Sequence, residues 1–496
     1  MKARELANLG IPDGEPLRLA VRACARAAEA GLSKESLRDA MKGVIENPQG
    51  YLQDPVFDRL AAELVGKPRV VFAEREEPAP WKNWGVGLEP ESVNQMARAC
   101  RLPVAAAGAL MPDAHVGYGL PIGGVLATRN AVVPYAVGVD IACRMRLSVL
   151  DLPVTMLGSD HERAKLEDAI EKETRFGVGA AFQRKRQHTV LDSDWGVSHI
   201  TSQNKDKAWA QLGTSGSGNH FVEFGVLTIS DEDVARRVGE RGGQGAAAEA
   251  DAGFGSGWRF ALPAGRYLAL LSHSGSRGTG AAVCDYYSKL AMKQHPELPK
   301  DLSYLAWLDL DSQEGRDYWN AMNLMGEYAA ANHECIHRHI VRAIGAEAVA
   351  YVENHHNFAW KEEHTLPGGT REELIVHRKG ATPAGAGVLG VIPGSMATPG
   401  FVVRGRGSAE SLMSASHGAG RVMSRTKAKL TFAWGNVKRE LADAGVKVMS
   451  AGIDEVPGVY KDIHQVMSQQ QDLVEVIGRF DPKLVKMAPE GERAED

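Results

Sequence analysis

The sequence lacks any apolar run of roughly the 18 or more residues that a membrane-spanning helix needs. Its start, MKARELANLG, contains no signal-peptide core. The five cysteines are widely spaced and odd in number, which argues against a disulfide framework and favours a reducing compartment. These absences exclude membrane and disulfide-rich secreted classes, and we expect a cytoplasmic protein without a membrane partner.

Two nucleotide-handling motifs are also absent. The sequence has no GxxxxGK[ST] loop and no KxDG motif with a nucleophilic lysine, which disfavours P-loop and lysine-adenylating mechanisms. An excess of basic residues is missing too, because the formal net charge is −5. Proteins that grip long duplexes are mostly basic. A local basic channel, helped by bound divalent ions, remains compatible with this charge.

The chain is long enough to contain more than one structural unit. With 496 residues, of which 44% are hydrophobic, it can bury a large core. Residues 1–75 have the apolar spacing of helices, with Ser33 as a helix cap and Asp54 and Pro55 as a cap and first helical position. The stretch EREEPAPWKNWG then resembles a linker. We predict a helical N-terminal extension and linker over 1–85 and a catalytic domain over 86–496.

The larger part of the chain has a mixed pattern. From Met111 onward, glycine-punctuated β-type runs alternate with helical segments near 160–172, 313–346 and 465–478. No internal repeat is present. The pattern predicts an α+β fold with a large layered sheet and surrounding helices.

Metal-binding side chains are grouped in glycine-flanked segments. The segments are GVDIAC, GSGNHFVE, LSHSGSRG and ENHHN. One carboxylate, one thiolate and three imidazoles suit two divalent transition ions while leaving positions open for substrate. Asp140 and Cys143 are three residues apart, a spacing that can turn both toward one ion. Free cysteines are usually small core residues, and an Asn–His pair often caps a turn, so the spacing alone leaves both interpretations open.

The C-terminal third carries a second kind of chemistry. HRKGAT, PGSM and SHGAGRVMSR occur within fifty residues of one another. A histidine in a turn this rich in glycine, followed by several arginines and lysines, indicates a nucleophile beside phosphates. The sequence therefore predicts covalent phosphate chemistry.

Eight motifs in a fixed order carry a family resemblance: MPDAHVGYGLPIGGV, GVDIAC, GSGNHFVE, HSGSRG, HN, HRKGAT, PGSM and SHGAGRVMSRTKAK. Together they resemble the RtcB family of GTP-dependent RNA ligases, from about Met111 to the C-terminus. The resemblance implies an RtcB-like catalytic domain that joins RNA 2′,3′-cyclic phosphate or 3′-phosphate ends to 5′-hydroxyl ends, in RNA splicing or repair. It also implies GTP and two Mn²⁺ ions as cofactors and a guanylylated histidine. Any activating protein partner stays unknown.

The resemblance assigns a role to each matching side chain. The implied metal ligands are Asp140, Cys143, His220, His273 and His356. The implied nucleotide contacts are Asn219, His220, Glu223, His356, Asn357, Pro393, Gly394, Ser395, Met396, Gly400, His417, Gly418, Ala419, Gly420, Tyr460 and Lys486. The implied RNA contacts are Arg277, His377, Arg378, Lys379 and Arg404.

Further detail of the catalytic set comes from the same resemblance. His417 is the implied nucleophile, followed by Gly418–Gly420, whose N–H groups are expected to meet phosphate at a helix start. Arg421 is expected to neutralise charge during phosphoryl transfer. Asp113 is the candidate base for the 5′-hydroxyl, or else a residue that caps a turn. Glu223 is expected to accept from the guanine base, and Tyr460 to stack on it.

Some residues depart from the family pattern or stand outside it. Arg144 occupies a position where the family usually has glycine, and Gly400 one where some relatives have serine. His355 matches no ligand and is expected to be structural. Lys427 and Lys429 are expected to lie on a solvated face.

Two alternative functions compete with the ligase. HECIH, at residues 333–337, has the HExxH form of a zinc metalloprotease helix, with His333 and His337 as ligands and Glu334 as base. It has no identified third ligand and explains none of the glycine-rich motifs. The other alternative is a catalytically inactive RNA-binding relative, which the complete set of motif residues disfavours.

Overall fold

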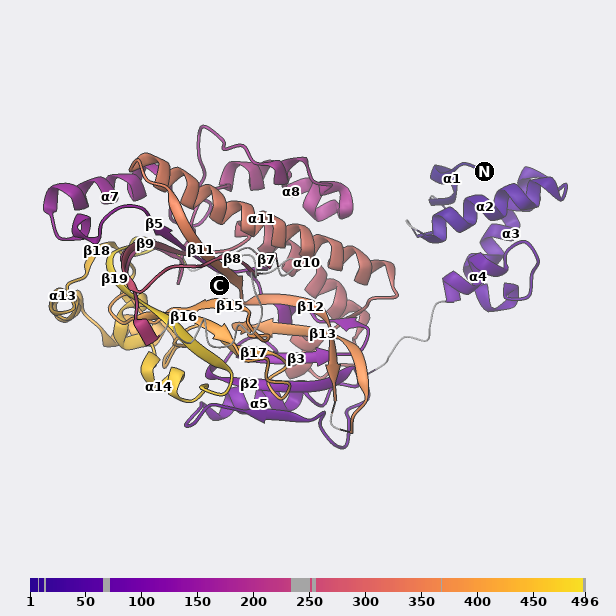
Figure 1. Cartoon of the computed structure of the whole chain (residues 1–496). Coiled ribbons are helices and arrows are strands. Elements are labelled where there is room, and N and C mark those ends of the chain that lie inside the picture. The colour runs from indigo at the N-terminus through magenta and orange to yellow at the C-terminus, as the bar shows by residue number, and fades with distance from the viewer. Residues whose placement is uncertain are drawn as a thin grey trace. The chain divides into compact units, whose positions relative to one another are not determined.

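The computed structural model describes residues 1–496 except 8, 13–14, 66–71, 233–249, 252–255, 367 and 494–496. The chain divides into two compact units (Figure 1). The smaller comprises Met1–Val71 and Leu308–Asp317, and the larger comprises Phe72–Trp307 and Tyr318–Asp496.

The described part of the smaller unit is mainly helical, as the sequence predicts. Its helices are α1 (Ala3–Ala7), α2 (Glu15–Glu29), α3 (Lys34–Glu46), the 3-10 helix η1 (Pro48–Tyr51) and α4 (Asp58–Val65). Their apolar faces enclose a core of their own, which includes Leu6, Met41 and Leu60.

Cap residues fix where these helices begin. The Ser33 hydroxyl accepts from the Ser36 N–H at 3.1 Å, so the predicted cap of α3 is confirmed. The prediction for Asp54 is wrong, because α4 begins only at Asp58. The Asp54 carboxylate instead accepts from Val56 and Phe57 and closes the turn that precedes the helix.

A long, mostly antiparallel sheet forms the framework of the larger unit (Figure 1). Its strands, in spatial order, are β15 (Leu389–Ile392), β16 (Gly400–Gly405), β19 (Val474–Met487), β6 (Phe221–Ile229), β9 (Gly265–Ser274), β5 (Arg144–Leu150), β11 (Ala348–His355), β8 (Ser256–Arg259) and β7 (Ala250–Asp251). A further strand, β18 (Lys447–Ser450), pairs with β19 in parallel.

A second sheet contributes the other half of the site. Its order is β1 (Trp81–Asn83), β2 (Ala105–His115), β3 (Ile122–Thr128), β13 (Arg371–Lys379) and β12 (Asn357–Thr365). Nearby, β14 (Ala381–Pro383) pairs with β17 (Ser414–Ser416). The stretch 74–85, expected as a linker, thus contains a strand that pairs with β2. The boundary between 1–85 and 86–496 stays a prediction.

Helices cover one face of the long sheet. Side chains of α7 (Asp160–Glu173) and α11 (Gln313–Ala343), such as Ile170 and Ile340, pack on Phe224 and Leu270 of the sheet. The other helices are α5 (Pro90–Ala99), α6 (Pro134–Val137), α8 (His199–Gln211), α10 (Arg277–Gln294), α12 (Arg425–Thr431), α13 (Trp434–Asp443) and α14 (Ile463–Ser468). Among the described residues, no helix has the length and apolar character to cross a bilayer.

Two of the predicted helical segments are confirmed and the third is partly wrong. Helices α7 and α11 correspond to 160–172 and 313–346. The predicted helix over 465–478 ends at Ser468, because β19 begins at Val474. Pairing with β16 on one side and β6 on the other satisfies the backbone of β19, which outweighs local helical spacing.

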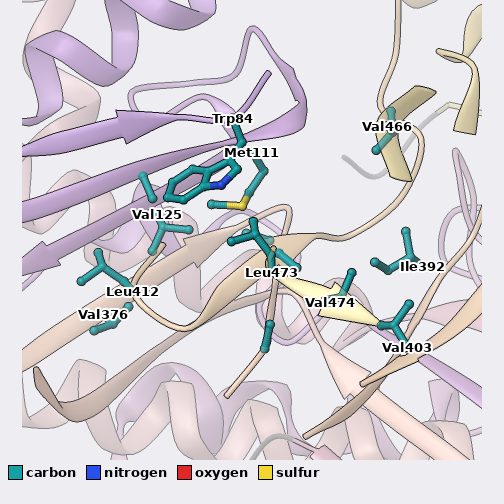
Figure 2. Packing of buried hydrophobic residues seen from close by; sticks show 14 of the residues in the cluster. Trp84, Met111, Val125, Val376, Ile392, Val403, Leu412, Val466, Leu473 and Val474 are labelled. Atoms are coloured by element: carbon teal, nitrogen blue, oxygen red, sulfur yellow. The ribbon is translucent and has the colours of Figure 1, made fainter. Parts of the chain in front are cut away.

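A shared core joins the two sheets. Trp84, Met111 and Val125 from the second sheet pack with Val403 of β16 and Val466 of α14 (Figure 2). This packing holds β2 against the segment after β17, so that Asp113 meets His417. The α+β prediction is confirmed.

Candidate active site

Three metal-binding side chains converge where strands of the long sheet begin or end. Cys143 precedes β5, His220 precedes β6, and His273 lies in β9. The register places His273 opposite both Met145 and Phe221, which brings the three side chains together. The Cys143 Sγ lies 3.4 Å from His220 Nε2 and 3.0 Å from His273 Nε2. All three ligand atoms lie within 4.8 Å of one another, as one metal ion requires.

Asp140 and His356 extend this cluster. An Asp140 carboxylate oxygen lies 3.0 Å from His220 Nε2, and His356 Nε2 lies 3.1 Å from His273 Nε2. All of these side chains are buried. The structure thus brings together every metal ligand expected from the sequence, and four of the five donors are imidazole or thiolate. The donor set suits a divalent transition metal.

The charge states of the cluster favour a cation. Burial, followed by the charge of His220, lowers the pKa of His273 to about 3. Burial also holds the pKa of His356 well below its ordinary value. Burial alone would raise the pKa of Asp140, but the hydrogen bond and charge of His220 and the charge of Arg277 outweigh it. At neutral pH, His273 and His356 are therefore neutral and Asp140 is ionised, which are the forms that bind metals.

Backbone contacts hold the ligands in place. The Cys143 carbonyl accepts from the His356 N–H at 3.0 Å, and the Asn357 carbonyl accepts from Ala142 at 2.7 Å. Asn357 also donates from its side chain to the Asp140 carbonyl at 3.3 Å. An added Cβ at Gly275 would lie 2.2 Å from an Asp140 oxygen, so a side chain at this position would displace the carboxylate.

His417 lies beside this cluster. Its ring centroid is 4.9 Å from that of His356. The Nδ1 of His417 lies 2.7 Å from Asp113 Oδ2, and the N–H groups of His417 and Gly418 donate to the same oxygen. A carboxylate at Nδ1 fixes the tautomer in which Nε2 is unprotonated and nucleophilic.

Asp113 is fully buried and held as an anion. Burial raises the pKa of Asp113, but the hydrogen bond and charge of His417 and the charge of Lys461 bring it below its ordinary value. Lys461 donates to the carbonyls of Pro112 and Ala114, on either side of Asp113. Sequence reasoning assigned no role to Lys461, although it directly follows Tyr460 in the motif GVYKDI.

The turn after His417 differs from the expectation. Residues 418–420 do not open a helix, because α12 begins at Arg425 with Ser424 as its cap. Gly420 has φ of 74° and approaches β2 so closely that an added Cβ would lie 2.0 Å from the Asp113 carbonyl. This glycine therefore presses the turn against β2, and the N–H of Gly418 binds Asp113.

Several expected nucleotide contacts share one wall. Phe221, Met396 and Tyr460 belong to one hydrophobic cluster with Met487. An added Cβ at Gly418 would lie 3.5 Å from the Pro393 carbonyl, so the loop 393–396 borders the His417 turn. Within that loop, the Ser395 N–H donates to Thr398. At Gly400 an added Cβ would lie 3.2 Å from Pro393, which leaves little room for the serine of some relatives.

Glu223 and Lys486 lie on the paired strands β6 and β19, and Asn219 directly precedes His220. Burial raises the pKa of Glu223 well above its ordinary value. Its β6 position pairs with Val485, next to Lys486. The Lys486 amine forms an ion pair with Glu171, and the Asn219 carbonyl is 3.0 Å from His273 Nδ1.

Arg421 is engaged within the protein. Its guanidinium donates to the carbonyls of Met423 and Asp454 and to the Glu455 carboxylate. It also lies 5.6 Å from the ring centroid of Tyr460. In this structure Arg421 ties its loop to the segment 453–460, and its catalytic role stays a prediction.

The expected RNA contacts are mostly buried. His377 accepts from the Val133 N–H at one ring nitrogen and lies 3.0 Å from the Leu126 carbonyl at the other. Arg378 makes two hydrogen bonds to Glu362. The other three differ in position: Arg277 contacts His220 at 3.3 Å, Lys379 donates to the Tyr118 carbonyl, and Arg404 pairs with Glu475. Arg277 thus touches the metal cluster through His220, and the RNA-binding roles stay predictions.

The HECIH segment lies within α11 and has a different bonding pattern from a zinc helix. His333 Nε2 lies 3.1 Å from the Ser274 carbonyl, so it donates, and its Nδ1 accepts from the Ser272 hydroxyl at 2.7 Å. The nitrogens of His337 lie 2.8 Å from the hydroxyls of Ser272 and Ser148. Both rings thus anchor α11 to the sheet, which argues against the protease.

The buried Arg144 forms an ion pair with Glu353. Its guanidinium is 3% exposed and lies 3.2 Å from Glu353, which also binds Arg146. It also donates to the Gly326 carbonyl of α11 at 3.4 Å. Arg144 therefore joins β5 to β11 and α11.

A buried carboxylate–histidine pair beside a thiolate–imidazole cluster defines a metal-dependent enzyme. A family model described as "tRNA-splicing ligase RtcB" matches residues 95–487. The chain belongs to this RtcB family of RNA ligases.

Curated relatives match most of the chain. The RNA-splicing ligase RtcB of Escherichia coli (strain K12) is 34% identical over 437 residues, covering 81% of this chain and 95% of the relative. The tRNA-splicing ligase RtcB of Nanoarchaeum equitans is 32% identical and covers 76% and 87%. That of Archaeoglobus fulgidus is 31% identical and covers 79% and 88%.

Proposed function

We propose that this protein joins RNA ends that carry a 2′,3′-cyclic phosphate or 3′-phosphate to ends that carry a 5′-hydroxyl, through a histidine–GMP intermediate. The observation that carries the proposal is the position of His417. Its Nδ1 is bound to the buried Asp113 carboxylate, and its ring lies against the His356 end of the metal cluster. A nucleophilic imidazole beside metal-bound phosphate is the arrangement that nucleotidyl transfer needs.

Two Mn²⁺ ions and GTP are the proposed cofactors. Asp140, Cys143 and His220 would hold one ion, and Cys143, His273 and His356 the other. Bound divalent ions would neutralise phosphate charge and lower the pKa of water that opens a cyclic phosphate. The 3.0 Å contact of Asp140 with His220 and the 3.1 Å contact of His273 with His356 support this division, and Cys143 lies close to both pairs.

The first step forms a bond between His417 Nε2 and the α-phosphorus of GTP. The bond from that phosphorus to the bridging oxygen breaks, and pyrophosphate leaves. Asp113 stabilises the positive charge that develops on the ring, because its carboxylate accepts from Nδ1. The guanylate then passes from His417 to the RNA 3′-phosphate. The 5′-hydroxyl attacks the phosphorus of this RNA phosphate, and GMP leaves.

Asp113 has two proposed roles in this sequence. Its Oδ2 is already occupied by His417 and two backbone N–H groups. We therefore propose orientation of His417 as its first role. The role of base for the 5′-hydroxyl would use Oδ1, which has no hydrogen-bond partner among the described residues.

Guanine selectivity is proposed to come from Glu223. Burial raises the pKa of the Glu223 carboxyl, and the guanine edge would supply two N–H donors that stabilise its charged form. Adenine cannot supply the same pair. The wall of Phe221, Met396 and Tyr460 gives the base an apolar face to pack against.

The cellular setting is also a proposal. All five cysteines are free and buried, which agrees with a reducing cytoplasm. We propose that the predicted N-terminal extension is separate from the catalytic domain, with the boundary before residue 81, because Trp81–Asn83 pairs with β2 of the larger unit. RNA ends and GTP are the proposed partners.

The test is labelling of the protein with α-labelled GTP and Mn²⁺. A phosphoramidate on His417 is expected to be acid-labile and alkali-stable. His417→Ala should abolish the label, while the matched change of a surface histidine, His161→Ala, should retain it. Label that persists in His417→Ala would overturn the assignment of the nucleophile.

A further inference from the structure

Two exposed tyrosines contact each other on the larger unit. Tyr118 is 60% exposed and Tyr304 is 37% exposed, and no other aromatic side chain in the described part of the chain is as open. Their ring centroids lie 5.6 Å apart with planes tilted by 55°. Tyr304 in turn packs edge-on against Tyr135 at 4.8 Å. The exposed aromatic surface is therefore concentrated at one place and supported from beneath.

The backbone under Tyr118 is held firmly. The Gln95 side chain of α5 both accepts from the Gly117 N–H, at 3.1 Å, and donates to the Gly117 carbonyl, at 2.6 Å. The buried Lys379 amine donates to the Tyr118 carbonyl at 2.5 Å. The Tyr118 ring is thus exposed on a fixed backbone. The protein would therefore lose little conformational entropy when a ligand covers the ring.

The same contacts tie this loop to the nucleophile. Tyr118 follows Asp113 on the continuation of β2. Lys379 precedes Gly380, where an added Cβ would lie 3.1 Å from Cε1 of the His417 ring. The tyrosine pair therefore borders the place where RNA ends would react.

We propose that Tyr118 and Tyr304 form a stacking platform for an unpaired nucleobase at a reacting RNA end. This inference rests on the proposed function. Single-stranded RNA is bound largely by stacking of bases on aromatic side chains, which every base permits because each has a π face. A ligase that accepts ends from different RNAs needs this kind of sequence-tolerant contact.

The first test measures binding of the full chain to a fluorescent single-stranded RNA. Stacking of one base contributes enough that Tyr118→Ala should weaken binding about 5- to 150-fold. Tyr118→Phe should restore binding, since it keeps the ring face. The matched control Val116→Ala, which changes an exposed side chain of the same loop, should bind like the wild type. Equal binding by Tyr118→Ala and the wild type would overturn the proposal.

The second test identifies the base. Abasic RNAs, made separately for the 3′-phosphate strand and the 5′-hydroxyl strand, are compared with intact RNA. If Tyr118 stacks on the terminal base of one strand, removal of that base should weaken RNA binding by the wild type. The same removal should leave RNA binding by Tyr118→Ala unchanged. If every abasic RNA weakened binding by the wild type and by Tyr118→Ala equally, the result would contradict stacking.

These binding measurements do not depend on GTP. A wild-type chain that binds RNA through Tyr118 but never labels His417 would refute the proposed reaction and keep the platform. A chain that labels His417 normally but shows no effect of Tyr118→Ala would refute the platform alone.

Discussion

The contact between Asp113 and His417 can be tested by Asp113→Asn, which keeps the shape of the side chain and removes its charge. The native carboxylate accepts from His417 Nδ1 at 2.7 Å and from two backbone N–H groups. All three contacts converge on Oδ2, so an asparagine oxygen at that position can still accept from the backbone and from Nδ1, but it carries no negative charge. The positive charge that develops on the ring as Nε2 attacks phosphorus would then lack its anionic partner.

The size of the effect follows from these contacts. Loss of a charge-assisted hydrogen bond costs about 1.5–3 kcal/mol. We therefore expect the guanylylation rate to fall about 10- to 150-fold. Mn²⁺ stoichiometry should stay unchanged, because Asp113 is not among the expected metal ligands.

The assay is single-turnover transfer of label from α-labelled GTP to the protein, with bound metal measured in parallel. The pKa of Asp113 lies below its ordinary value in the fold. The stability it contributes is therefore present above about pH 4 and is lost as the pH falls through the lower folded value. At pH 7 the comparison thus measures the ionised form. A rate within about threefold of the wild type would refute the orientation argument.

Three further changes test other parts of the site. Cys143→Ala should lose ligation and bind fewer than two Mn²⁺ by metal analysis, whereas His333→Ala should keep both; a metal-free His333→Ala would favour the protease. Gly275→Ala should displace the neighbouring carboxylate and weaken metal binding in a titration, while Gly435→Ala, which has open space around it, should not. Burial lowers the pKa of His377 to about 4. The neutral ring's contribution to the free energy of unfolding is complete above about pH 6.5 and declines below it, by on the order of 3 kcal/mol at pH 4. A free energy of unfolding, measured with denaturant, that did not change between about pH 6.5 and pH 4 would be inconsistent with a buried neutral ring.

The sequence was sufficient to predict the donor atoms of the site but not the path of the chain between them. Asp140, His220 and His273 each lie two residues from a glycine, and at Gly275 a side chain would collide with the Asp140 carboxylate. Such constraints are local and can be recognised in a motif. The α+β class was also predictable, because β-type and helical segments alternate along the sequence.

Other features depend on tertiary partners that no local pattern specifies. The segment after Ser468 becomes a strand because β16 and β6 flank it. Arg378 looks like an RNA contact in sequence, yet Glu362 neutralises it in the interior. The HECIH pattern looks like a zinc helix, but hydroxyls of the sheet occupy its rings. In each case a neighbour distant in sequence decides the outcome.

The central claim is that His417 activates a 3′-phosphate, so the origin of the junction phosphate tests it most directly. An RNA with a labelled 2′,3′-cyclic phosphate is incubated with a 5′-hydroxyl RNA, GTP and Mn²⁺. We predict joining in which the labelled phosphorus becomes the junction phosphate, with no joining when GTP is omitted. The opposite pair, a 3′-hydroxyl and a 5′-phosphate, should stay unjoined because it offers no acceptor for GMP. Efficient joining of that pair by the purified protein would contradict the account.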